Sequence, residues 1–116
     1  MTETKVLVEG SWPPQACTLP TAERPLRLTE FDELFASAVR GVERVDPLRV
    51  RLELRPEPAV AARAADLVVR ETACCSFFTF TLGATAGRLT LDVAVPAGRV
   101  AVLDALAARA EPGDRR

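Results

Sequence analysis

Two adjacent cysteines, Cys74 and Cys75, and a carboxylate one helical turn before them, Glu71, are the residues of this sequence best suited to chemistry. All three lie on the apolar stripe of a predicted helix, since helical residues repeat at about 100° each. A charged group within such a stripe is costly unless it is paired or bound to a cation. The pattern indicates a soft-metal or metalloid site, or a thiol redox centre, and does not choose between them.

The third cysteine, Cys17, lies in a proline-rich stretch far from the pair. Three thiolates without an imidazole suit arsenite, mercury, cadmium, lead or copper(I), and Glu71 as a fourth ligand would suit zinc. We predict that the Cys17 sulfur lies within about 4 Å of the sulfurs of Cys74 and Cys75, as thiolates about 2.3 Å from one metal would. Oxidation would join Cys17 to one of the pair, because adjacent Cα atoms, about 3.8 Å apart, disfavour a bridge between neighbours.

Three other interpretations of these residues stay open. Cysteine is often buried as a small apolar group, which would make the chain a structural or dimerisation module. In a thiol-dependent reductase or lyase of arsenate or organometal type, one of the pair would attack, Cys17 would resolve and Glu71 would accept the proton. Whether the protein is an enzyme is left open. Glu71 could instead form a salt bridge to an arginine such as Arg40, Arg63 or Arg70.

Composition narrows the classes of function. A chain of 116 residues with 48% hydrophobic residues predicts one domain over residues 1–116. The 15 basic and 16 acidic residues give a net charge of −1, which argues against nucleic-acid and anionic-membrane partners. The absence of histidine and tyrosine excludes Ser-His-Asp and Cys-His catalysis. The sequence carries no signature of a nucleotide, haem or flavin cofactor.

The subcellular location follows from the apolar segments. The first residues hold only a short apolar run, Val6 to Val8, and no run approaches the length of a membrane span. We therefore expect a cytoplasmic protein with reduced thiols.

Hydrophobic periodicity predicts strands over 4–9, 48–55, 77–82 and 88–95, and helices over 29–45, 58–75 and 96–110. Thr29 is the expected N-cap of the first helix, and a turn spans Gly83 to Gly87. Residues 1–25 combine the first strand with the proline-rich loop, and residues 111–116 form a frayed tail. The order β-α-β-α-β-β-α predicts an α+β two-layer sandwich, with about three helices on one face of a small, mostly antiparallel sheet. An edge strand and an alanine-rich last helix leave a homodimer open.

Two segments, CTLPTAERPLRLTEFDELF from Cys17 and ETACCSFFTFTL from Glu71, carry a family resemblance. They resemble short actinobacterial proteins with adjacent cysteines, some of which are labelled arsenate reductase or heavy-metal-resistance protein. The resemblance implies a cytosolic thiol protein of metal or metalloid stress, with Cys17, Glu71, Cys74 and Cys75 at the matching positions. None of the cysteines has an arginine six positions on, so the Cys-x5-Arg loop of phosphatase-like arsenate reductases is missing.

Overall fold

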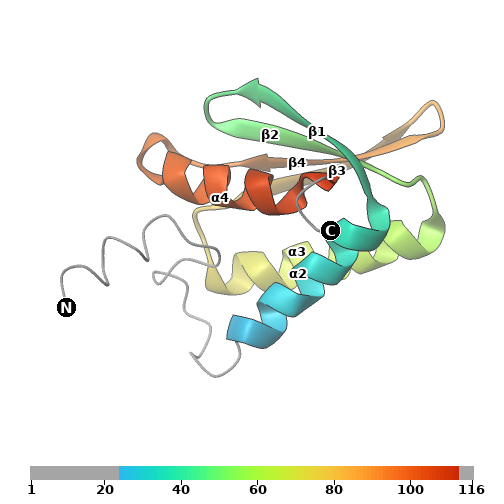
Figure 1. Cartoon of the computed structure of the whole chain (residues 1–116), viewed down its shortest axis with the longest axis horizontal. Helices are drawn as coiled ribbons and strands as arrows, with labels where there is room; N and C mark the ends of the chain where they lie inside the picture. The colour runs from blue at the N-terminus through green and yellow to red at the C-terminus, as the bar shows by residue number, and fades with distance from the viewer. Residues whose placement is uncertain (1–23, 113–116) are drawn as a thin grey trace.

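The computed structural model describes residues 24–112, in which three α-helices cover one face of a four-stranded antiparallel sheet (Figure 1). The helices are α2 (Arg24–Ala38), α3 (Pro58–Cys74) and α4 (Val100–Ala110), the last preceded by a 3-10 turn, η2 (Ala97–Arg99). The strands are β1 (Val39–Asp46), β2 (Arg49–Leu54), β3 (Thr79–Thr85) and β4 (Arg88–Ala94). The predicted α+β class is confirmed. No helix in this part of the chain is both long and apolar enough to cross a membrane.

The sheet has the strand order β1-β2-β4-β3, and every neighbouring pair is antiparallel. Because β2 and β3 are both antiparallel to β4, they run parallel to each other with β4 between them. Helix α3 connects these two strands and crosses the sheet on the helical side (Figure 1). The end of α3 is therefore placed close to the start of β3, where the two cysteines lie.

The hydrophobic core fills the space between the sheet and the helices. Alternate residues of β2 and β4 face it, and the register places them opposite one another: Val50 with Val93, Leu52 with Leu91, and Leu54 with Leu89. The helices contribute buried residues that recur every three or four positions, as an amphipathic helix requires. These are Phe31, Leu34, Phe35 and Ala38 of α2, Ala64, Leu67 and Val68 of α3, and Val102, Leu103, Leu106 and Ala110 of α4.

The predicted helix over 29–45 is wrong at both ends. Helix α2 already begins at Arg24 and ends at Ala38, and residues 39–46 form strand β1. The pairing with β2 shifts between Val39 and Gly41, so the β-bulge turns Val39 and Val42 to the same face. Their spacing of three then imitates a helical stripe. The predicted strand at 4–9 lies outside the described residues.

The hairpin of β3 and β4 is confirmed, but its turn is shorter than the predicted one. Gly83 pairs with Thr90 inside the ladder, and the chain reverses at Ala86 and Gly87. Both turn residues have positive φ, 51° for Ala86 and 76° for Gly87. Two such residues are typical of the type I′ turn, whose twist matches that of the flanking strands.

Candidate metal and thiol site

Glu71 is fully buried in the last turns of α3, with an exposed fraction of 0%. Pro58 at the first position of α3 starts the helix with its φ already fixed. The predicted stripe of α3 then packs inward as expected, with Ala64, Leu67 and Val68 buried. Glu71 follows them on the same face. The carboxylate is consequently held inside the protein by the packing of the whole helix.

Arg27 of α2 is the cation that accompanies Glu71. Its Nη1 donates a hydrogen bond of 2.6 Å to Glu71 Oε1 and lies 3.6 Å from the Sγ of Cys74. Burial lowers the pKa of Arg27, but the hydrogen bonds to Glu71 and Cys74 outweigh it, so the pKa is raised overall. The Arg27 guanidinium and the Glu71 carboxylate thus form an ion pair that is almost entirely shielded from water.

The predicted salt bridge of Glu71 to an arginine is therefore present, but its partner is Arg27 and none of the arginines that we expected. Arg63 bonds to Glu33, and Arg70 bonds to Glu30 and to Asp66. Sequence reasoning missed Arg27 because the first helix was predicted to begin only at Thr29. A signal was present, since Arg27 precedes Phe31 by four positions and thus lies on the apolar stripe of α2. When the apolar stripes of two helices each contain one charged residue, and the two charges have opposite signs, a buried ion pair between the helices is indicated.

One oxygen of the Glu71 carboxylate has no hydrogen-bond partner. Within residues 24–112, Glu71 Oε2 is the buried side-chain oxygen for which no donor is found. A buried carboxylate oxygen in this condition forgoes much of its solvation, which costs about 1–3 kcal/mol or more for a charged group. A buried polar atom without a partner requires an explanation, and a bound ion is one of the usual ones.

The two thiols lie beside this carboxylate. Helix α3 ends at Cys74, and Cys75 leaves the helix with φ −124° and ψ 87°, while its backbone N–H donates to the Glu71 carbonyl at 2.7 Å. The break brings both sulfurs and a carboxylate oxygen of Glu71 within 4.8 Å of one another. Cys75 is buried and Cys74 half-buried, and both are thiols. These three residues could hold a metal ion, whereas Cys17 lies outside the described residues.

Three features of the surroundings bear on a cation at this place. The C-terminal end of a helix carries partial negative charge, which favours a cation and disfavours a thiolate. Arg27 acts in the opposite direction and favours the thiolate of Cys74. The buried ring of Phe78 follows Cys75 by three residues and contacts the rings of Phe77 and Phe80, at 4.7 and 5.2 Å between centroids. A cluster of three phenylalanine rings therefore follows the thiols directly in the sequence.

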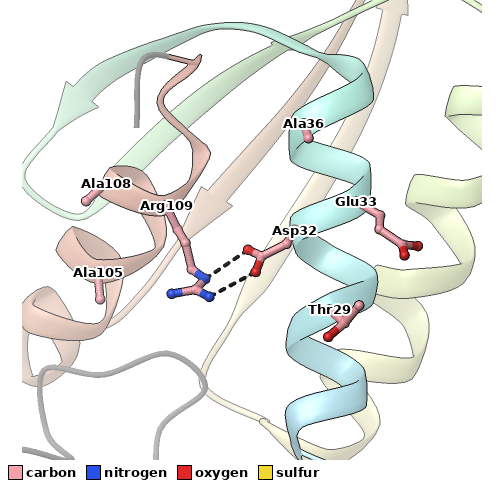
Figure 2. Close-up of a pocket in the computed structure, with 7 residues that line it drawn as sticks. All are labelled: Thr29, Asp32, Glu33, Ala36, Ala105, Ala108 and Arg109. Carbon is pink, nitrogen blue, oxygen red and sulfur yellow. Dashed lines mark hydrogen bonds and ion pairs between the residues drawn. The ribbon is translucent and has the colours of Figure 1, made fainter. Parts of the chain in front are cut away.

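A separate hollow of about 630 Å³ lies between α2 and α4. Figure 2 shows that Asp32 and Arg109 reach across it and form a two-pronged ion pair, with both hydrogen bonds at 2.9 Å. Ala36, Ala105 and Ala108 line the rest, with Thr29 and Glu33. The hollow shares no residue with the thiol cluster, and both of its carboxylates are held in ion pairs, Asp32 with Arg109 and Glu33 with Arg63.

Comparison with protein-family models, with curated proteins and with solved structures finds no match for this chain. The resemblance to short actinobacterial proteins with adjacent cysteines accordingly stays a prediction. The function of the chain is therefore inferred from the chemistry of the site.

Proposed function

We propose that this protein binds a soft metal or metalloid ion through Glu71, Cys74 and Cys75, with Cys17 as the expected further ligand. The observation that carries the proposal is the group of two sulfurs and one carboxylate oxygen within 4.8 Å. Metal–thiolate bonds of about 2.3 Å let one ion reach both sulfurs after small side-chain adjustments. Binding would serve capture or hand-off of the ion in metal or metalloid stress, in the cytoplasm.

Equilibrium dialysis of the reduced full-length chain against zinc, cadmium, mercury and arsenite tests this proposal. We expect one ion per chain and a loss of binding in the double variant Cys74→Ser/Cys75→Ser. Cys17→Ser should weaken binding by about 10–100-fold if that residue is a ligand. The matched control is Ser76→Ala, which alters the exposed next residue and should bind as the wild type does. Unchanged stoichiometry in the double cysteine variant would contradict the proposal.

The contact between Arg27 and the Cys74 sulfur favours a second candidate, a thiol-dependent reductase. A cation 3.6 Å from a sulfur stabilises the thiolate relative to the thiol. The thiolate is the nucleophile in thiol chemistry. The rate of alkylation of Cys74 should then show a midpoint well below about pH 8.5, the value for an unperturbed thiol. An ordinary midpoint, together with no turnover of arsenate or of a disulfide substrate, would remove this candidate.

A further inference from the structure

Glu71 Oε2, which has no hydrogen-bond partner within the described residues, limits the classes of ion that the site can bind. We propose that the site selects a divalent cation of the zinc–cadmium class, with Glu71 as a direct ligand, over trivalent arsenic. This inference rests on the proposed function, because it names the ion class of the same site. It depends on three observations: the burial of Glu71, the hydrogen-bonding state of its two oxygens, and the number of charges around it.

The two oxygens of Glu71 differ in their partners. Oε1 accepts the hydrogen bond from Arg27, whereas Oε2 has no partner within the described residues. Ligating carboxylates usually have one oxygen held by a neighbouring donor, which orients the other toward the metal. Arg27 is therefore a positioning residue, and Oε2 is the oxygen that remains for an ion.

The donor set of one oxygen and two sulfurs fits ions of intermediate softness. Zinc accepts thiolates and carboxylates in the same tetrahedral site, at about 2.3 and 2.0–2.2 Å. Calcium and magnesium require many oxygen ligands, and copper(I) favours sulfur alone. A mixed set in which the single oxygen is buried and has no partner within the described residues therefore favours a divalent ion that uses all three donors.

Charge balance supports the same choice. Arg27 and Glu71 neutralise each other, so a divalent cation bound to the thiolates of Cys74 and Cys75 leaves the buried group with no net charge. Binding displaces one proton from each thiol. Arsenite instead exchanges two hydroxyl groups for the two thiols and releases two water molecules, with no net proton freed, and it offers Oε2 only its third hydroxyl group as a neutral hydrogen-bond donor. Buried charge must be compensated, and of the two only the divalent ion offers Oε2 a positively charged partner.

The experiment compares Glu71→Gln with the wild type for zinc, cadmium and arsenite, each added alone to the reduced full-length chain. We expect zinc and cadmium to bind the variant about 10–100-fold more weakly, and arsenite to bind both proteins equally. The control Glu33→Gln removes an exposed carboxylate of α2 and should change no affinity. Circular dichroism shows whether Glu71→Gln folds.

A second measurement needs no variant. Calorimetric titration of the wild type at one pH, in buffers of different ionisation enthalpy, should show about two more protons released per zinc or cadmium ion than per arsenite, whatever the protonation of the two thiols, because arsenite also turns two hydroxyl groups into water. Arsenite binding without zinc or cadmium binding, or an equal loss of all three ions in a folded Glu71→Gln, would overturn the inference and leave the proposed function intact. Failure of every ion to bind the wild type would overturn the proposed function itself.

Discussion

At the scale of single residues, the site is organised by a buried pair of opposite charges from two helices. Arg27 and Glu71 are 44 residues apart in the sequence and 2.6 Å apart in the structure. Because Glu71 is fully buried, its charge is compensated within the protein rather than by water. A buried ion pair adds little net stability to a protein, but the removal of one partner leaves the other as an uncompensated buried charge and is strongly destabilising.

Replacement of Arg27 by methionine should therefore strongly destabilise the folded protein. Arg27→Met leaves the Glu71 carboxylate buried without a cation, which should lower the free energy of unfolding by about 3–5 kcal/mol. Urea unfolding of both proteins measures the change. The control is Arg70→Met, because Arg70 makes exposed ion pairs with Glu30 and Asp66 that are worth about 0–1 kcal/mol. The double variant Arg27→Met/Glu71→Met should recover most of the loss; equal losses in the two single variants would contradict the interpretation.

At the scale of elements, the sequence predicted the helices and strands that have a local hydrophobic pattern. It failed where the structure of a segment depends on pairing with another strand. The stripe of α3 with Glu71, Cys74 and Cys75 follows from periodicity alone, so the candidate ligands on α3 could be found. Strand β1 could not, since its bulge is recognised only against β2. The partner of Glu71 was missed for a related reason, because a wrong start of α2 excluded Arg27 from the helix.

The turn between β3 and β4 yields a prediction at this scale. Ala86 has a φ of 51°, in the left-handed region where a Cβ costs roughly 1–2 kcal/mol. Asparagine tolerates this region and is favoured at the first position of a type I′ turn. We expect Ala86→Asn to raise the free energy of unfolding by about 0.5–1 kcal/mol. Thermal unfolding measures it, with Ala86→Val as the opposite case, since a β-branched side chain at positive φ should destabilise the hairpin.

At the scale of the whole molecule, the face of the sheet opposite the helices is bound together by ion pairs. Arg51 of β2 holds Asp92 of β4 by two hydrogen bonds of 2.8 and 3.0 Å. Arg88 of β4 likewise donates two hydrogen bonds to Glu53 of β2. The hydrogen bonds from Arg51 lower the pKa of Asp92, against the raising effect of burial, and those from Arg88 lower the pKa of Glu53.

These lowered pKa values make the stability of the fold dependent on acid. A carboxylate with a lowered pKa in the folded protein stabilises it above the unfolded values, about 3.9 for Asp and 4.3 for Glu, and this contribution disappears as the pH falls through the folded pKa. Urea midpoints should therefore decrease from about pH 5 to about pH 2. Asp92→Asn should be less stable than the wild type at neutral pH and should approach it at the acid end. Asp104→Asn, which breaks the exposed pair with Arg44, should follow the wild-type profile because exposed pairs are screened by water. A profile of Asp92→Asn that stays parallel to the wild type at every pH would show that the sheet face does not govern acid stability.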